Sequence, residues 1–340
     1  MVMASGIDLA QHIDIFQCPK CQGNLRLDDE EMRCTECNQG FPIDDDIPML
    51  FWPDEADENG DDVVQTVKDF YEETPFPDYN DFDSVGSLVQ KARQGIFARM
   101  LDEQVPPGVR VIECGCGTGQ LSNFLSITNR TVFGTDMCMN SLRLGQNFAR
   151  EHQLSRVRFV QHNLLRPAFK PESFHLVISN GVLMTTPDPF ETFRTISELV
   201  EPGGYILIGL YHRYGRLVTD ARRLLFNMTG DRFLSLDPNL RNESLSDARR
   251  RAWFLDQYKH PHEVKHTIGQ AMGWLRDAGF TFVRSLPPTK LSQSISGKEK
   301  LFEYEEPGNS FERTLVELGM FFKGSLEGGF FNVIGRKDRS

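Results

Sequence analysis

The segment Arg110–Gly119, R-V-I-E-C-G-C-G-T-G, constrains the fold of this chain more than any other stretch. Its apolar residues predict a short strand, and glycines then stand at three alternate positions, Gly115, Gly117 and Gly119. Glycine permits a sharp turn at the end of a strand and lets a ligand approach the main chain closely. An apolar-periodic helix is expected over 120–127, with unpaired amide groups at its start. The segment therefore predicts a strand–loop–helix unit that binds a nucleotide-type cofactor.

The spacing of these glycines argues against a dinucleotide cofactor. The dinucleotide pattern G-x-G-x-x-G needs a glycine where this chain has Gln120. The pattern is instead E-x-G-x-G-x-G, with Glu113 at the end of the strand. A carboxylate there favours a cofactor that carries an ammonium group and repels a pyrophosphate. The motif resembles the glycine loop of class I S-adenosylmethionine (SAM) methyltransferases.

Further strand patterns follow in the order that this resemblance implies. They lie at Thr131–Asp136, Val157–Asn163, Phe174–Asn180, Tyr205–Leu210, Phe280–Leu286 and 328–335. Helical patterns between them are typical of a parallel sheet. We therefore expect an α/β fold, a Rossmann-like doubly wound methyltransferase sheet of seven strands, with a small N-terminal zinc ribbon and a helical cap insertion.

The resemblance also assigns the cofactor-binding residues. The glycine loop would hold the methionine part of SAM, Asp136 the ribose, and Met137, Asn163 and Leu164 the adenine. The family usually has an aspartate at position 163, and an asparagine carbonyl accepts the same hydrogen bond. The complete expected set is Glu113, Gly115, Cys116, Gly117, Gly119, Asp136, Met137, Asn163, Leu164 and Asn180.

Two C-x-x-C knuckles, Cys18–Cys21 and Cys34–Cys37, lie near the N-terminus. Each knuckle can present two thiolates to one tetrahedral ion, so we expect Cys18, Cys21, Cys34 and Cys37 to hold a structural Zn²⁺. Four protein ligands leave no open position for catalysis. Four free thiols are the alternative. The ribbon resembles the small zinc-ribbon activator of tRNA and protein methyltransferases and the zinc module of a 23S rRNA guanine methyltransferase.

The expected organisation is a zinc ribbon over 1–52, an acidic linker over 53–63 and a methyltransferase domain over 64–340. Tyr71, Phe76 and Tyr79 are candidates for a lid over the cofactor, with ordinary packing as the alternative. A helical cap is expected over 213–259 and a later insertion over 287–327. The cap has ten cationic and six acidic side chains. Its arginines would either meet a carboxylate or phosphate of the substrate or form a solvated helical face.

The segment His260–His266, H-P-H-E-V-K-H, contains H-E-x-x-H, which on a helix places two imidazoles one turn apart. Its place after the fifth strand argues against a zinc protease. We expect a helix to begin here and to bury Val264, Ile268, Ala271 and Leu275. Tyr211, His212, His262 and His266 are expected to line the acceptor pocket, where one histidine would take a proton. A metal-binding histidine pair and plain surface histidines are the alternatives.

The composition bears on the class of partner. The net charge of -11 disfavours a large nucleic-acid footprint. The chain has no run of 18 apolar residues and no basic-then-apolar N-terminus, and its seven cysteines form no disulfide-like framework. We therefore expect a cytoplasmic protein without a membrane span. The sequence does not indicate an oligomeric state.

The stretch S-N-G-V-L-M-T-T-P-D-P-F after the fourth strand resembles ubiquinone and menaquinone biosynthesis methyltransferases. These usually have two histidines where this chain has Met184 and Thr185. The resemblance implies methyl transfer from SAM to an oxygen, nitrogen or carbon atom of a small-molecule acceptor by direct displacement. The alternatives are a tRNA or rRNA methyltransferase that uses the ribbon to recognise RNA, and a non-catalytic SAM-binding partner protein.

Overall fold

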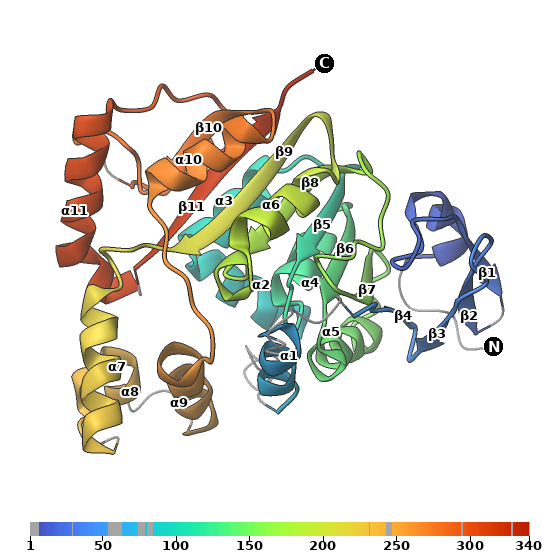
Figure 1. Cartoon of the computed structure of the whole chain (residues 1–340), viewed down its shortest axis with the longest axis horizontal. Helices are drawn as coiled ribbons and strands as arrows, with labels where there is room; N and C mark the ends of the chain where they lie inside the picture. Colours follow the sequence, from blue (N-terminus) through green and yellow to red (C-terminus); the bar gives the residue numbers. More distant parts are fainter. Residues whose placement is uncertain are drawn as a thin grey trace.

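The structure is a computed structural model that describes residues 7–28, 30–53, 63–73, 79, 84–230, 232–242, 247–293, 295–327 and 329–339. Most of the expected acidic linker, residues 54–62, and the lid candidate Phe76 lie outside these residues. Figure 1 shows a central sheet with helices on both sides and the N-terminal unit at one end.

The strands of the doubly wound core are β5 (Arg110–Cys114), β6 (Thr131–Asp136), β7 (Val157–His162), β8 (Phe174–Asn180), β9 (Val200–Tyr211), β10 (Phe280–Leu286) and β11 (Phe330–Lys337). Their order across the sheet is β7-β6-β5-β8-β9-β11-β10. The first five are parallel, and β11 runs antiparallel between β9 and β10. The expected α/β fold is confirmed. The winding reverses between β5 and β8, which is where ligands bind in sheets of this kind.

Alternate residues of the buried strands pack on opposite faces of the sheet, as the period of a strand requires. Val111 belongs to one apolar cluster and Ile112 to the other, and both are fully buried. The Val111 face is covered by α2 (Val85–Gln94), α3 (Ile96–Gln104), α4 (Gln120–Ser126) and α5 (Met139–Glu151). The Ile112 face is covered by α6 (Pro189–Ser197), α10 (Ile268–Asp277) and part of α11 (Ser310–Glu327).

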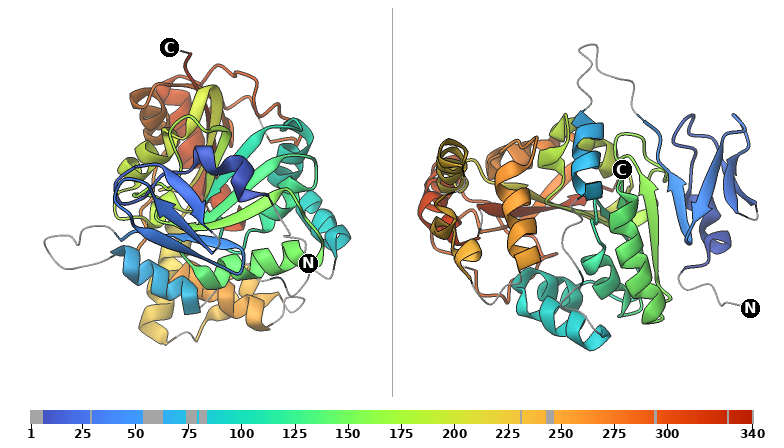
Figure 2. Two further views of the ribbon diagram at one scale, coloured as in Figure 1. Left: turned by 90° about the vertical axis from the view of Figure 1, so that its right-hand side faces the viewer. Right: turned by 90° about the horizontal axis from the view of Figure 1, so that it is seen from below.

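The N-terminal unit continues the same sheet. Its strands are β1 (Leu25–Asp28), β2 (Glu31–Cys34), β3 (Gly40–Asp44) and β4 (Ile47–Leu50), and β4 pairs in parallel with β7. The sheet therefore has eleven strands and is longer than the expected one. Figure 2 shows this unit standing against the edge of the core.

The N-terminal unit also covers a part of the sheet that has no helix of its own. The connection from β7 to β8 contains no helix in any of its residues, all of which are described. The 3₁₀ helix η1 (Leu9–Ile15) and Phe16 fill that place. The ring of Phe16 packs 4.7 Å from that of Phe169, and the amide of Gln17 donates to the carbonyl of Ala168 over 3.0 Å. The ribbon is therefore part of the core packing.

A helical segment follows β9, as expected for the cap. It consists of α7 (Leu217–Thr229), η3 (Leu234–Leu236), α8 (Pro238–Arg241), α9 (Asp247–Phe254) and the π-helical turn η4 (Leu255–Lys259). Two further elements line the site described below. Helix α1 (Val63–Glu73) precedes the core, and the 3₁₀ turn η2 (Leu183–Thr185) follows β8. Among the described helices, none is both long and apolar enough to cross a bilayer.

The predicted helix over His260–His266 is wrong. Residues 260–267 are extended because main-chain hydrogen bonds tie them to the core: Val264 donates to Met184 over 2.8 Å, and His266 donates to Tyr211 over 2.9 Å. Helix α10 begins only after Thr267, whose side chain forms a capping box with Gln270. The two histidines of H-E-x-x-H therefore do not lie one helical turn apart. The expected burial of Ile268, Ala271 and Leu275 is confirmed.

The stretch from Val85 to Gln104 forms two helices. Helix α2 ends and α3 begins at Gly95, whose φ of -78° and ψ of 122° are those of extended chain. Glycine destabilises the interior of a helix, so the chain bends at this residue. Both helices pack on α4.

Candidate functional site

A cavity of about 750 Å³ opens at the carboxyl ends of β5, β6, β7 and β8. Its floor is the glycine loop after β5, and its opposite wall comes from α1, η4 and the extended segment after η4. This is the topological switch point of the sheet, and the volume is within the range of small-molecule sites. One cavity thus joins the expected cofactor residues to the cap.

The glycine loop has the conformation that its sequence predicts. Gly115, Gly117 and Gly119 have φ values of 75°, 53° and 72°. A Cβ atom on Gly115 would lie 2.4 Å from Val182, and one on Gly119 would lie 2.2 Å from the ring of Phe159. Gly115, Cys116 and Gly117 line the cavity, whereas Gly119 packs behind it. The loop therefore needs glycine both for its backbone angles and for its close packing.

Glu113 lies at the end of β5 with only 7% of its surface exposed, and it lines the cavity. Its carboxylate accepts a hydrogen bond from Ser122. Burial raises the pKa of Glu113 to about 7, because a carboxylate removed from water is costly without a cation beside it. An ammonium group in the cavity would supply that cation, so this residue fits the amino-acid end of SAM.

Asp136, at the end of β6, holds the loop and also lines the cavity. Its two oxygens accept from the amides of Gly117 and Cys138, each over 2.9 Å. Each carboxylate oxygen keeps a further lone pair that could accept a ribose hydroxyl. Burial raises the pKa of Asp136 above its ordinary value.

The adenine side of the expected site lies at the ends of β6 and β7. Met137, Asn163 and Leu164 line the cavity, and Gln161 donates to the carbonyl of Met137 over 2.9 Å. The Asn163 Oδ1 accepts from the amide of Leu165 over 3.0 Å. Asn180, at the end of β8, lines the cavity and accepts from Asn332 over 2.7 Å.

Comparison with known proteins agrees with this geometry. Residues 106–252 match a family model described as a methyltransferase domain. Residues 106–252 form a methyltransferase domain. The model spans the strands from β5 to β9 and the first part of the cap, so it includes the whole cofactor side of the cavity.

Curated relatives match part of this chain. A ubiquinone biosynthesis O-methyltransferase of Albidiferax ferrireducens is 30% identical over 107 residues, which are 31% of this chain and 42% of that protein. A demethylmenaquinone methyltransferase of Geobacillus is 25% identical over 202 residues, which are 52% of this chain and 85% of that protein. A solved phosphoethanolamine N-methyltransferase 2 of Haemonchus contortus has 19% identity and a TM-score of 0.48, covering 80% of this chain and 60% of its own. The chain spans about half the length of the first curated relatives it matches.

The four cysteines of the ribbon come together as expected. Their sulfur atoms all lie within 4.8 Å of one another. The Cys18–Cys37 and Cys21–Cys34 distances are 3.7 and 3.5 Å. Sulfurs bound to one tetrahedral Zn²⁺ at about 2.3 Å are separated by roughly 3.8 Å, so the cluster fits zinc. The amides of Glu36 and Cys37 donate to the Cys34 sulfur, each over 3.4 Å, as suits a thiolate that binds a metal.

The expected acceptor residues are only partly brought together. Tyr211 lines the cavity of the methyltransferase domain, but His212, His262 and His266 are not among its lining residues. His212 is fully buried beside β11, and its Nδ1 accepts from the amides of Tyr214 and Gly215. His266 packs with its ring 4.7 Å from that of Trp274. Burial lowers the pKa of both His212 and His266 to about 4, so both are neutral.

The cavity contains two histidines that the sequence reasoning did not assign to it, His162 and His260. His162 ends β7 and is 1% exposed, and neither ring nitrogen has a hydrogen-bond partner among the described residues. Burial lowers its pKa to about 3. His260 packs against Phe70 and Tyr71 of α1. The sequence did offer a signal that His162 lies at the cavity, because it directly precedes Asn163 at the end of a predicted strand. It offered no such signal for His260, because that residue reaches the cavity only through the extended chain after η4.

Of the lid candidates, Tyr71 lines the cavity and donates through its hydroxyl to Asp256 of η4 over 3.0 Å. Tyr79 instead accepts from Asn123 over 2.8 Å and packs on Phe148. Helix α1 thus meets the cap across the cavity through Tyr71.

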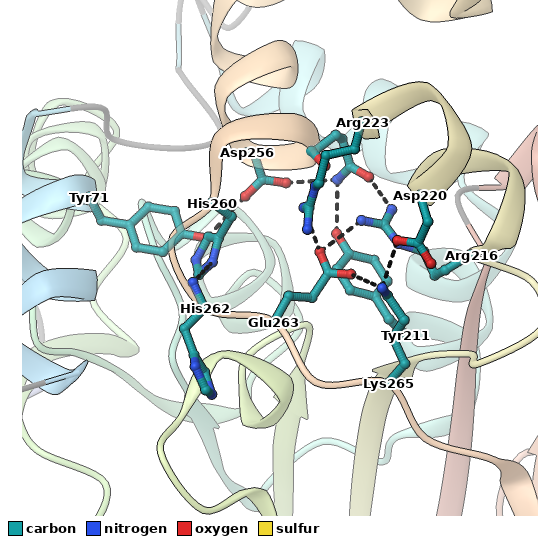
Figure 3. Close-up of polar contacts among 11 residues, drawn as sticks. Tyr71, Tyr211, Arg216, Asp220, Arg223, Asp256, His260, His262, Glu263 and Lys265 are labelled. Carbon is teal, nitrogen blue, oxygen red and sulfur yellow. Dashed lines mark hydrogen bonds and ion pairs between the residues drawn. The ribbon is translucent and has the colours of Figure 1, made fainter. Parts of the chain in front are cut away.

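Two arginines of the cap point into a buried network of charges, as Figure 3 shows. Arg216 donates to one oxygen of Glu263 over 2.8 Å, and Arg223 donates to the same oxygen over 3.1 Å. The guanidinium of Arg216 also lies over the ring of Tyr211, 3.8 Å from its centre. Neither arginine is among the residues that line the cavity. For these two arginines, the predicted contact with a substrate carboxylate or phosphate is therefore not supported.

Proposed function

We propose that this protein transfers the methyl group of SAM to a small, largely apolar molecule bound between the sheet and the cap. The observation that carries the proposal is that one cavity joins the glycine loop to the cap. Apolar side chains of α1, α2 and the cap supply much of its wall, among them Val67, Leu88 and Trp253. Such a space suits a cofactor and a small acceptor held face to face.

SAM supplies a methyl group already activated by a sulfonium, so the protein mainly has to align the acceptor and exclude water. Glu113 would bind the ammonium group, Asp136 the ribose hydroxyls, and Met137, Asn163 and Leu164 the adenine. The buried walls of the cavity would keep water from the reacting atoms. Tyr211 and His260 are the residues that we assign to contact with the acceptor.

Three considerations support a small molecule over RNA. Two of the relatives are a ubiquinone biosynthesis O-methyltransferase and a demethylmenaquinone methyltransferase. Arg216 and Arg223 are paired inside the cap and would not reach a phosphate backbone. The net charge is -11, which opposes binding of a long polyanion.

We also infer a cytoplasmic location, which the seven unpaired cysteines fit.

The test is a transfer assay with methyl-labelled SAM and a cell extract separated into organic-soluble, small polar, RNA and protein fractions. Label in the organic-soluble or small polar fraction is the expected result. Label in nuclease-sensitive material would reject the small-molecule acceptor in favour of RNA. SAM binding without label in any fraction would favour a non-catalytic partner protein. The matched control is the Glu113→Gln variant, which keeps the size of the side chain and removes the charge that we assign to the cofactor.

A further inference from the structure

Two buried polar atoms at the cap wall have no hydrogen-bond partner among the described residues. They are Oε1 of Glu263 and Nε2 of His260, and both residues line the cavity. The Glu263 side chain is 2% exposed, and His260 is 8% exposed. Buried polar atoms are nearly always paired, so each of these two needs a ligand or a water molecule.

Glu263 presents a fixed hydrogen-bond acceptor. Its Oε2 receives both arginines, which leaves Oε1 toward Lys265 at 3.7 Å, beyond hydrogen-bond distance. The arginines also lower the pKa of Glu263 against the effect of burial, so the group stays ionised. An ionised carboxylate accepts hydrogen bonds and cannot donate one.

His260 presents a fixed hydrogen-bond donor. Its Nδ1 accepts from the amide of His262 over 3.2 Å, so that nitrogen has no proton. Burial lowers the pKa of His260, which keeps the ring neutral. A neutral imidazole without a proton on Nδ1 has it on Nε2. The atom that needs a partner is therefore an N–H group.

The charges at this wall argue against an anionic ligand. Asp256 and Glu263 both line the cavity, and Asp256 already receives Tyr71 and Gln257. Among the lining residues, all of which are described, Lys91 of α2 is the one lysine or arginine, and it is exposed. A carboxylate or phosphate at the cap would face the carboxylates of Asp256 and Glu263, because the buried Arg216 is already paired with Glu263 and does not line the cavity.

We infer that the acceptor is a neutral molecule with an apolar body, a hydroxyl group that donates to Glu263 Oε1 and a second oxygen that accepts from His260 Nε2. This inference rests on the proposed function and names the substrate class of the same site. Glu263 and His260 select the molecule. The ion pairs to Glu263 serve to hold Oε1 in place and keep it ionised.

The test is calorimetric binding of small probes to the full chain saturated with S-adenosylhomocysteine. The probes are 2-methoxyphenol, 1,2-dimethoxybenzene (which lacks the hydroxyl donor), benzoate and phenyl phosphate. We expect 2-methoxyphenol to bind about tenfold or more tightly than 1,2-dimethoxybenzene, because a hydrogen bond to a buried charge is lost with the hydroxyl. Benzoate and phenyl phosphate should bind more weakly than either. Equal binding of the two ethers, or tighter binding of an anion, would overturn the inference.

Two variants test which residue causes the preference for the hydroxyl probe. Glu263→Gln should bring the preference for the hydroxyl close to onefold, whereas His260→Phe should weaken both methoxy probes by about two- to tenfold and keep the preference. Unchanged S-adenosylhomocysteine affinity shows that each variant is folded. If Glu263→Gln does not fold, the wild-type probe series and His260→Phe still decide. If S-adenosylhomocysteine does not bind the wild-type chain, the proposed function fails; if it binds and the hydroxyl preference is missing, only this inference fails.

Discussion

The side-chain amide of Asn163 donates to the main-chain carbonyl of Trp52 over 3.3 Å. Asn163 stands at the adenine end of the cavity, and Trp52 follows the last strand of the ribbon. The metal site at the N-terminus is therefore joined to the cofactor site by a hydrogen bond and by the pairing of β4 with β7.

Removal of zinc should weaken SAM binding. A chelator, or the Cys21→Ser variant, would release the loop that positions Trp52, and loss of one hydrogen bond corresponds to about a two- to tenfold drop in affinity. Calorimetric titration with SAM measures this affinity. Added Zn²⁺ should restore the SAM affinity of the chelated wild-type protein but not that of the variant. Full SAM affinity in protein shown to be free of metal would contradict the coupling.

Alanine at Gly115 should damage the cofactor site beyond the strain of its backbone. The new Cβ would lie 2.4 Å from Val182, in a residue with a φ of 75°. Gly108 is a matched control, because its φ is 81° and a Cβ there would meet nothing within 4 Å. Gly108→Ala should cost about 1–2 kcal/mol of unfolding free energy and leave SAM affinity unchanged. Gly115→Ala should cost more and lower SAM affinity at least about tenfold; equal behaviour of the two variants would disprove the close packing.

SAM affinity should rise with pH around neutrality. The pKa of Glu113 is raised to about 7 in the protein without cofactor, so the side chain is mostly protonated at pH 6 and mostly ionised at pH 8. Because the ammonium group of SAM favours the ionised form, binding should release a proton, and affinity should increase through this range and then level off. Calorimetric titrations in buffers of different ionisation enthalpy measure the number of protons released on binding. Glu113→Gln should bind weakly with no such rise; the same pH dependence in that variant would assign it to another group.

Arg216 should matter for stability. Its side chain is fully buried against Glu263, so Arg216→Met leaves a buried carboxylate with fewer cations and should cost roughly 3–5 kcal/mol of unfolding free energy. Arg213 is exposed on the same loop, and Arg213→Met should change stability by less than about 0.5 kcal/mol. Urea unfolding followed by circular dichroism compares the two. Similar small losses in both variants would show that the buried network contributes little.

Local sequence patterns predicted the core of the fold well. The bounds of β6, β8 and β10 agree residue for residue with the expected strands, because each is a short, largely apolar run that ends at a polar residue or just before a proline. Gly115, Gly117, Asp136 and Asn163 line the cavity, since their positions follow from where parallel strands end.

The features that were missed depend on contacts between distant segments. The pairing of β4 with β7 has no local signature, so the ribbon seemed separate from the sheet. The H-E-x-x-H segment has a helical pattern, but hydrogen bonds to Met184 and Tyr211 hold it extended. One local signal was available: Thr267 and Gln270 have the spacing of a capping box, which marks the true start of α10.

The place of β4 in the sheet has a consequence for the order of events during synthesis. The ribbon leaves the ribosome before the methyltransferase core, and its four thiols can bind a metal ion before that core is made. The strand that β4 pairs with, β7, is made only after the entire glycine loop has emerged. Until then the newly made ribbon has an open strand edge, which is a template for pairing with other chains. Early capture of zinc therefore keeps this edge in one defined shape until its partner strand arrives.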